Sequence, residues 1–151
     1  MKPEAIAVRR AELSDLDAIV AVEESSFDGD VMSRRSLRRY IGAPAATMQV
    51  ATVDGVVAGY ALTSLTRGHR AARLFSIAVS SRFGRRGLGK ILLDAAEAAE
   101  RARAAKALRL EVRRDNHAAA ALYRKAGYDL FDEVADYYED GEAALRFEKA
   151  L

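Results

Sequence analysis

The chain has 151 residues, of which half are hydrophobic and 30% are charged, an ordinary composition for a globular protein of one domain. A formal net charge of only +2 does not indicate a nucleic-acid-binding protein. The absence of cysteine excludes disulfides and thiolate chemistry, and two histidines are too few for a histidine-based metal site. No run approaches the ~18 apolar residues of a membrane span, and residues 1–10 lack the apolar segment of a signal peptide. We therefore expect a cytoplasmic protein without a metal, nucleic-acid or membrane partner.

Hydrophobic periodicity and turn residues predict strands and helices that alternate along the chain. In order, they are a strand at 5–9, a helix opened by Ser14, a basic helix capped by Ser33 and ending at 41, strands at 48–53, 56–65 and 74–79, a helix at 88–104, a strand at 108–112, a helix capped by Asp115 or Asn116 and ending at 125, and strands at 128–138 and 143–147. Ser14 and Asp17 have the spacing of a capping box, and Asp54-Gly55 is a strong hairpin signal. The order β-α-α-β-β-β-α-β-α-β-β predicts an α/β fold, a mixed sheet with helices on both faces.

The most informative stretch is 74–93, where a buried strand leads through a glycine-rich loop into a helix. The loop glycines are Gly84, Gly87 and Gly89, and the basic residues around them are Arg82, Arg85, Arg86 and Lys90. The first N–H groups of a helix have no partner within the helix, so this loop predicts a site for a phosphate group. The stripe of the following helix that should be buried consists of Leu88, Ile91, Leu92, Ala95, Ala98, Ala99 and Ala102.

Three phosphate-containing ligands suit such a loop, and the neighbouring residues separate them. Nucleotide hydrolysis needs Ser or Thr after the loop lysine to hold magnesium, but Ile91 follows Lys90. A dinucleotide needs a third glycine three residues after Gly89, where Leu92 stands. The pyrophosphate of coenzyme A requires neither a Ser or Thr after Lys90 nor a third glycine at position 92, so it remains compatible with the loop. A plain glycine turn between a strand and a helix is the interpretation that involves no ligand.

The stretch resembles the GCN5-related N-acetyltransferase (GNAT) family, whose loop reads Arg/Gln-x-x-Gly-x-Gly/Ala after an Ile-Ala-Val-like strand. Here 84–89 reads Gly-Arg-Arg-Gly-Leu-Gly after Ile77-Ala78-Val79, and Gly84 replaces the usual Arg or Gln. The resemblance covers essentially the whole chain and implies the GNAT fold as a single domain over 1–151, with acetyl-CoA as co-substrate. The residues that it assigns to acetyl-CoA binding are Ile77, Ala78, Val79, Arg85, Arg86, Gly87, Leu88, Gly89 and Lys90. The backbone N–H of Val79 is expected to polarise the thioester carbonyl.

A second stretch, 108–128, carries the candidate catalytic residues. In a strand whose leucines face one side, Glu111 faces the other, and Asn116 and Tyr123 lie two helical turns apart on one helix face. A strand carboxylate and a helix phenol can thus flank one cleft. The stretch is similar to the RimI-like branch of the family, which acetylates protein N-terminal α-amines. This similarity implies that Glu111 is the general base, that Tyr123 is the general acid, and that Asn116 and Tyr123 contact coenzyme A.

The chemistry of amine acylation suits these residue types. An ammonium group has no lone pair, so a proton must leave before the amine attacks a thioester. An α-amine with a pKa of about 8 costs only about 1.4 kcal/mol to neutralise at pH 7, whereas a lysine amine costs roughly 4–5 kcal/mol. A carboxylate acting through a water molecule can remove that proton, and a phenol can protonate the departing thiolate.

Each candidate also has a purely structural interpretation. Glu111 can pair with Arg109 or Arg113 on a solvated strand face, and Tyr123 has the helical spacing of a core residue. Asn116 is expected to cap its helix in either case.

The acceptor is the least determined part of the prediction. The resemblance assigns Phe27, Tyr137 and Tyr138 to acceptor binding, but Phe27-Asp28-Gly29 departs from the Phe-Pro-Trp-like RimI pattern. We expect a protein N-terminus as the acceptor, with a small amine as the alternative, and a monomeric or homodimeric enzyme. A non-catalytic coenzyme A sensor and a nucleotide-binding module are the remaining hypotheses.

Overall fold

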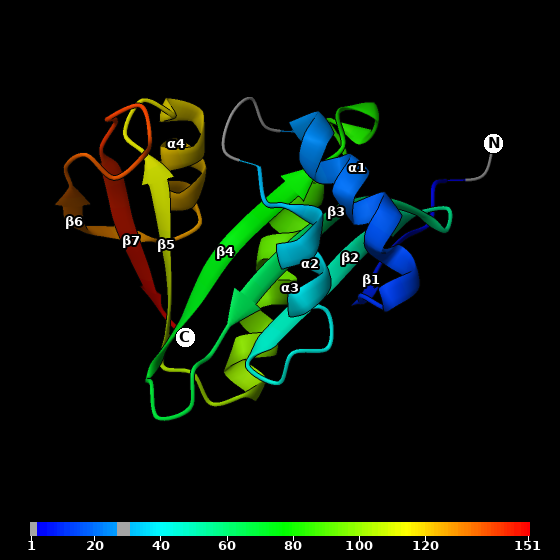
Figure 1. Cartoon of the computed structure of the whole chain (residues 1–151), viewed down its shortest axis with the longest axis horizontal. Helices are drawn as coiled ribbons and strands as arrows, with labels where there is room; N and C mark the ends of the chain where they lie inside the picture. Colours follow the sequence, from blue (N-terminus) through cyan, green and yellow to red (C-terminus); the bar gives the residue numbers. More distant parts are fainter. Residues whose placement is uncertain (1–2, 27–30) are drawn as a thin grey trace.

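A computed structural model describes residues 3–26 and 31–151 (Figure 1). Its strands are β1 (Ile6–Arg10), β2 (Ala46–Val53), β3 (Val56–Ser64), β4 (Ala71–Val79), β5 (Ala107–Arg113), β6 (Asp129–Val134) and β7 (Ala144–Ala150). Its helices are α1 (Leu16–Ser26), α2 (Arg34–Tyr40), α3 (Leu88–Ala102) and α4 (His117–Lys125), with 3-10 turns at Leu13–Asp15 and Ser81–Phe83. The predicted order of elements is confirmed. Within the described ranges, no helix combines the length and apolar character that crossing a membrane requires.

The seven strands form one mixed sheet in the order β1-β2-β3-β4-β5-β7-β6, in which only β4 and β5 run parallel. Helices α1 and α2 lie on the face turned toward the viewer in Figure 1, which we call the front face. Helix α3 packs behind β2, β3 and β4, and α4 lies behind β5 (Figure 1). This arrangement confirms the predicted α/β fold with helices on both faces of the sheet.

Strands β4 and β5 pair over only three residues and then separate. The parallel register joins Ala71–Arg73 to Ala107–Arg109, and beyond it the two strands diverge (Figure 1). A bulge in β4 lies at this point, because Leu74 pairs with Thr63 and Ser76 with Leu62, which leaves Phe75 as the extra residue. A bulge bends its strand and increases the local twist. The second half of β4 is therefore left without a neighbouring strand on the side of β5.

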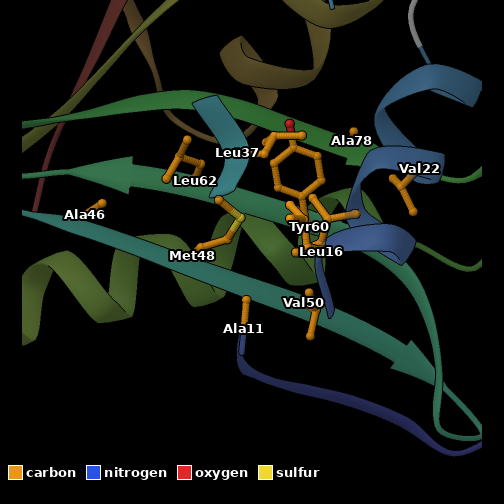
Figure 2. Packing of buried hydrophobic residues seen from close by; sticks show 11 residues of the cluster. Ala11, Leu16, Val22, Leu37, Ala46, Met48, Val50, Tyr60, Leu62 and Ala78 are labelled. Carbon is orange, nitrogen blue, oxygen red and sulfur yellow. The ribbon is translucent and has the colours of Figure 1, made fainter. Parts of the chain in front are cut away.

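The front layer is held by an apolar cluster between α1, α2 and strands β2–β4 (Figure 2). Leu37 of α2 and Tyr60 of β3 are completely buried there, and Leu16 and Val22 of α1 pack against the same cluster. Burial of side chains of this size stabilises the fold by about 1.5–3 kcal/mol each. Helices α1 and α2 are therefore fixed on the front of β4.

A buried carboxylate links this cluster to the start of α2. The side chain of Glu23 in α1 accepts a hydrogen bond from the Tyr60 hydroxyl at 2.6 Å and another from the Met32 N–H at 2.7 Å. The Tyr60 hydroxyl also lies 2.9 Å from the hydroxyl of Ser76 in β4. Because a buried charge without partners is costly, this network holds the segment that enters α2 against the sheet.

Several predicted caps and turns have the expected geometry. The Ser33 side chain accepts a hydrogen bond from the Ser36 N–H at the start of α2. Asp54 and Gly55 have φ angles of 50° and 81°, as a two-residue hairpin turn requires. Gly127 has a φ of 96°, the left-handed conformation that commonly ends a helix.

The predicted capping box at Ser14 and Asp17 is wrong by two residues. Asp15 accepts a hydrogen bond from the Glu12 N–H at 2.7 Å, and Arg9 donates two hydrogen bonds to the same carboxylate, each at 2.8 Å. The box therefore opens a 3-10 turn that precedes α1, and the Arg9 contacts lower the pKa of Asp15. Arg9, six residues before Asp15 and outside the capping motif, thus decided between the two carboxylates.

The predicted buried stripe of α3 is only partly correct. Leu88 and Leu92 are buried as expected, but Ala98 and Ala102 are exposed, and the residues buried further along the helix include Glu97 and Glu100. Both carboxylates are partnered. Glu97 accepts hydrogen bonds from Tyr128 and Lys149, and Glu100 accepts them from Thr63 and Arg103. Burial of an alanine side chain contributes little free energy. The buried face of α3 therefore carries the two partnered carboxylates in place of Ala98 and Ala102.

The predicted last hairpin is also shorter than expected. Strand β6 ends at Val134, and residues 135–143 form the connection to β7, so Tyr137 and Tyr138 lie in a loop and not in a strand. Asp136 has a φ of 52°, a left-handed conformation that ends regular strand geometry.

Replacement of Gly59 by alanine tests the close packing of α3 and β4. An added Cβ would lie 2.8 Å from the Ala78 carbonyl oxygen and 3.0 Å from Leu92 Cδ1, so the backbone would have to shift. We expect Gly59→Ala to lower the free energy of unfolding by about 2 kcal/mol in urea denaturation. Gly84→Ala, whose Cβ would meet only the Ser81 oxygen at 3.6 Å, should change it by less than about 0.5 kcal/mol. Equal stability of the two variants would contradict the packing described.

Candidate active site

The edge of β4 that faces β5 presents unpaired backbone donors. Ser80 N–H donates to the Ala58 carbonyl at 2.8 Å, which fixes the phase of the antiparallel β3–β4 ladder. Hydrogen-bonded and non-hydrogen-bonded pairs alternate in such a ladder, so the N–H groups of Ile77 and Val79 point away from β3. In the described part of the chain, no strand pairs with β4 on that side beyond Arg73. Ile77 and Val79 can therefore bind an extended ligand as a neighbouring strand would.

At the end of β4 the chain forms the predicted loop and enters α3. Gly87 is the N-cap residue of α3 and has a φ of 70°, which glycine adopts without strain. The Ile91 N–H donates to the Gly87 carbonyl at 3.1 Å, so the N–H groups of Leu88, Gly89 and Lys90 precede the first helical hydrogen bond. Together with the helix dipole, these N–H groups form a site that favours an anion.

Gly89 is required neither by the backbone nor by packing. Its φ lies outside the left-handed region, and a Cβ at this position would meet nothing within 4 Å. A glycine inside a helix costs about 0.5–1 kcal/mol relative to alanine, and the fold of this chain offers no compensation. The open space in front of Gly89 is therefore available for a ligand that approaches the backbone closely, as a pyrophosphate does.

The basic residues of the loop differ in their partners. Arg86 donates hydrogen bonds of 2.7 and 2.8 Å to Glu4, which lower the pKa of the Glu4 carboxyl and raise that of Arg86. Lys90 pairs with Asp94 at 3.0 Å. Arg85 is exposed, has a φ of 63°, and makes no hydrogen bond or ion pair within the described residues. Of these three side chains, that of Arg85 is therefore the one that can bind an anion without breaking an ion pair.

Glu111 lies on the front face of β5 between two arginines. Its carboxylate is 3.2 Å from Arg73 Nε of β4 and 3.6 Å from Arg146 Nε of β7. The side chain is 11% exposed and lines a cavity of about 540 Å³ together with Phe75 of the β4 bulge. The partners of Glu111 thus come from the two neighbouring strands, and not from Arg109 or Arg113 of its own strand.

Tyr123 projects from α4 on the opposite side of β5. It packs against the cluster formed by α4, β5 and β7, and its ring lies 5.7 Å from that of Tyr128 in an edge-on contact. Burial raises the pKa of the Tyr123 phenol to about 12, so the group remains protonated at neutral pH. Asn116 is the N-cap residue of α4, as predicted, and accepts a hydrogen bond from the Ala119 N–H at 3.1 Å.

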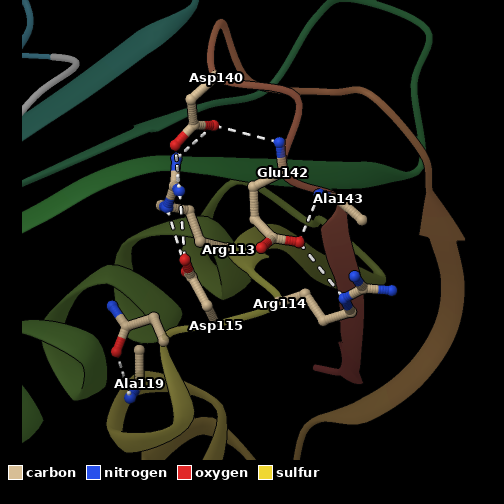
Figure 3. A network of polar contacts seen from close by, with 8 residues as sticks. Arg113, Arg114, Asp115, Ala119, Asp140, Glu142 and Ala143 are labelled. Carbon is tan, nitrogen blue, oxygen red and sulfur yellow. Dashed lines mark hydrogen bonds and ion pairs between the residues drawn. The ribbon is translucent and has the colours of Figure 1, made fainter.

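The loop at 135–143 is fixed beside the end of β5 by charged contacts (Figure 3). Arg113 donates to Asp140 at 2.6 Å and also pairs with Asp115, which lowers the pKa of Asp140 and raises that of Arg113. Arg114 lies 3.3 Å from Glu142 in the same loop. These contacts hold the loop that carries the two predicted acceptor tyrosines.

The loop tyrosines are placed by arginines of the sheet. Arg73 donates a hydrogen bond of 3.1 Å to the Tyr137 hydroxyl, and Arg113 lies 4.9 Å from the centroid of the Tyr138 ring. Arg73 therefore contacts both Glu111 and Tyr137.

The structure thus places Glu111 and Tyr137 in contact with the same side chain, that of Arg73. Tyr123 lies on the opposite side of β5 from Glu111. Within the described residues, no hydrogen bond, ion pair or ring contact joins Glu111 to Tyr123. Phe27, the remaining predicted acceptor residue, lies outside the described residues. The described chain contains no cluster of three or more His, Asp or Glu side chains suited to a metal ion.

Sequence reasoning missed the residues that surround Glu111. Arg73 and Arg146 contact its carboxylate, and Phe75 lies beside it in the cavity and stacks on Tyr40 of α2 at 5.7 Å. The available signal was an arginine inside the otherwise apolar run of β4, but strand register was needed to connect it to Glu111.

A parallel strand pair that separates, backbone donors along one edge and an anion site at the next helix suit an extended ligand with a phosphate group, such as an acyl-coenzyme A. Glu111 and Tyr123 lie on opposite sides of β5. The chain belongs to the acetyltransferase (GNAT) family, whose family model matches residues 13–128. It is an acetyl-CoA-dependent N-acetyltransferase.

Individual relatives cover nearly the whole chain. A putative [ribosomal protein bS18]-alanine N-acetyltransferase of Bacillus subtilis (strain 168) is 33% identical, over 92% of this chain and 91% of the relative. An N-alpha-acetyltransferase of Sulfurisphaera tokodaii is 30% identical, over 91% of this chain and 88% of the relative. The crystal structure of the ribosomal-protein-S18-alanine N-acetyltransferase from Escherichia coli superposes with a TM-score of 0.87 at 28% identity, covering 97% of this chain and 94% of that chain.

Gly89→Ala tests whether Gly89 serves ligand binding and not the stability of the fold. Because the added methyl group meets no protein atom, the ligand-free variant should unfold at the same or a slightly higher urea concentration than the wild type. The methyl group should nevertheless obstruct the pyrophosphate and raise the dissociation constant for coenzyme A about tenfold in calorimetry, a cost of about 1.4 kcal/mol. Unchanged coenzyme A affinity in a stable variant would show that the ligand does not approach this residue.

Proposed function

We propose that the enzyme acetylates the N-terminal α-amine of a protein or peptide. The main support is the position of Glu111, which lines a cavity next to the point where β4 and β5 stop pairing. The names of the relatives, which include ribosomal-protein-alanine N-acetyltransferases and N-alpha-acetyltransferases, support the same class of acceptor. The proposed enzyme is cytoplasmic and acts as one catalytic domain, in which β1, β6 and β7, outside the family match, complete the sheet.

The residues around the gap fit acetyl-CoA. The N–H groups of Leu88, Gly89 and Lys90 would hold the pyrophosphate. Arg85 in the loop and Asn116 at the start of α4 would add contacts to the coenzyme. Bound acetyl-CoA supplies a thioester whose acetyl group passes to the amine and whose sulfur leaves. Its extended arm would lie along β4, where the N–H groups of Ile77 and Val79 face the gap. One of these two groups, Val79 in our assignment, would polarise the thioester carbonyl.

Glu111 would remove the proton from the attacking amine. Its carboxylate faces the cavity and is held in place by Arg73 and Arg146, so it does not need to reorient. The proton passes from the ammonium group to the carboxylate, directly or through a water molecule, and leaves the nitrogen lone pair free to attack. An α-amine costs about 3 kcal/mol less to deprotonate than a lysine, which favours N-termini as acceptors.

Tyr123 would supply the proton that the leaving sulfur needs. It lies across β5 from Glu111, so a thioester that passes between β4 and β5 would have the base on one side and the acid on the other. Its raised pKa keeps the phenol protonated at the pH at which the enzyme works. Proton transfer to sulfur as the carbon–sulfur bond breaks prevents the return of the thiolate.

A panel of acceptors tests the proposed class of substrate. The protein is incubated with acetyl-CoA and peptides with free or blocked N-termini, and with polyamines, amino acids and aminoglycosides, and free thiol and product mass are measured. We expect acetylation of free N-termini and none of the blocked peptides, even when these contain lysine. Turnover of small amines with none of the peptides would contradict the proposal.

Glu111→Gln should lower kcat/KM for a peptide about 100-fold at pH 7, the typical contribution of a general base. The loss should shrink toward pH 9, where more of the amine is already neutral. Asp17→Asn removes an ion-paired carboxylate of α1, distant from the cavity, and should leave the profile unchanged. An equal loss at pH 6 and pH 9 would contradict the role of a base.

Tyr123→Phe should lower kcat by about 10- to 100-fold while the affinity for acetyl-CoA measured by calorimetry stays the same. Because burial raises the Tyr123 pKa to about 12, the wild-type phenol is protonated throughout pH 6–9. The loss should therefore be the same at every pH in this range. Full activity of the variant, or a loss that appears only above pH 8, would rule out this residue as the acid.

A further inference from the structure

The cavity beside Glu111 has more positive than negative charge in its walls. Its charged lining residues are Arg70, Arg73, Arg109 and Arg146, against the single carboxylate of Glu111. Glu148 and Asp132 approach Arg109 and Arg146 but do not themselves line the cavity. An acceptor that enters the cavity therefore meets mainly guanidinium groups.

Most of the hydrogen-bonding capacity of these arginines is unused. Arg146 lies 3.6 Å from Glu111 and 3.8 Å from Asp132, both beyond hydrogen-bond distance. Arg109 donates to Glu148 through Nε alone, and the Arg70 side chain has no hydrogen bond or ion pair with any described residue. A guanidinium group has five N–H donors arranged to bind carboxylates in pairs. The unused donors suit further carboxylates.

Two of the arginines are held in place by an aromatic ring. The guanidinium carbons of Arg109 and Arg146 each lie 5.1 Å from the centroid of the Phe131 ring in β6. Phe131 is 43% exposed on this otherwise uncovered part of the sheet. Stacking of this kind stabilises an arginine by about 0.5–1 kcal/mol at exposed sites and limits its rotation. The two groups are thus oriented before any acceptor arrives.

These arginines are too far away to serve the phosphates of coenzyme A. The anion site lies beyond Val79, and the cavity lies at Arg73, six strand residues earlier. At about 3.3 Å per residue, roughly 20 Å of β4 separates the two. The cavity arginines therefore remain available to the acceptor when the coenzyme is bound.

The geometry points to acidic acceptors: N-termini in which aspartate or glutamate follows the first residue. This inference rests on the proposed function and adds the substrate class. The α-amine would lie at Glu111, and the second to fourth residues would extend past Arg109, Arg146 and Arg70. Carboxylates there would form charge-assisted hydrogen bonds, and lysine or arginine would meet like charges.

Three peptides of equal length and with the same N-terminal alanine test the inference. Their next three residues are Asp-Glu-Asp, the matching amides Asn-Gln-Asn, or Lys-Arg-Lys, and free glutamate is a fourth acceptor. We expect kcat/KM for the acidic peptide to exceed that for the amide peptide about tenfold, with the basic peptide lowest. The difference should decrease as salt rises from 50 to 500 mM, because the charges are partly exposed.

Arginine variants show whether the cavity causes this preference. Arg70→Gln and Arg109→Gln should each reduce the acidic-to-amide ratio roughly threefold, within the range of one partly exposed ion pair. Arg101→Gln removes an exposed arginine of α3, on the other side of the sheet, and should leave the ratio unchanged.

The inference is overturned if the amide or basic peptide is acetylated as well as the acidic one, or if Arg101→Gln changes the ratio as much as the cavity variants do. In those cases, N-terminal acetylation itself still stands. Acetylation of free glutamate with no reaction of any peptide would instead overturn the proposed function.

Discussion

The short pairing of β4 with β5 is the constraint on which the site depends. The two strands are joined only by Ala71–Arg73 and Ala107–Arg109, and the bulge at Phe75 then turns β4 away. A fully paired β4 would use its edge N–H groups in hydrogen bonds to β5 and would leave no backbone donor for a ligand. Because the strands part, the backbone donors of Ile77 and Val79 face an opening. The C-terminal end of this edge leads through the glycine-rich loop to the start of α3, and the cavity beside Glu111 is lined by residues of the N-terminal half of β4.

The rest of the fold keeps this opening in shape. On the front, α1 and α2 pack on β2–β4 through the cluster around Tyr60, and Glu23 fixes the entry to α2 (Figure 2). Behind the sheet, a buried hydrogen bond from the Thr63 hydroxyl of β3 to the Glu100 carboxylate joins α3 to β3. On the side of β5, Arg113 holds the 135–143 loop over the end of the strand (Figure 3). One apolar cluster lies between α1, α2 and β2–β4, and a second packs residues of β4 and α3 against β5, α4 and β7, so the molecule stays joined behind the place where the two strands diverge.

The sequence predicted the order of the elements and the anion loop because both depend on local chemistry. Glycine spacing, the Asp54-Gly55 turn and the caps at Ser33 and Asn116 act within a few residues, and all have the expected geometry. The errors arose where distant residues decide the outcome. Arg9 selected Asp15 over Asp17, and the buried Glu97 is partnered by Tyr128 and Lys149, 31 and 52 residues further along the chain. Neither the pairing of Arg73 and Arg146 with Glu111 nor the β4 bulge can be read from the local sequence, because both follow from strand register.

Amide hydrogen exchange at Ile77 and Val79, measured by NMR with and without acetyl-CoA, shows whether the coenzyme binds along the open edge of β4. We expect fast exchange of these two amides in the free enzyme and at least about tenfold protection when acetyl-CoA binds. The amide of Ala78, which points into the β3–β4 ladder, should change little. If calorimetry shows that acetyl-CoA binds while exchange at Ile77 and Val79 is unaltered, the ligand does not lie along the open edge of β4, and the account is wrong.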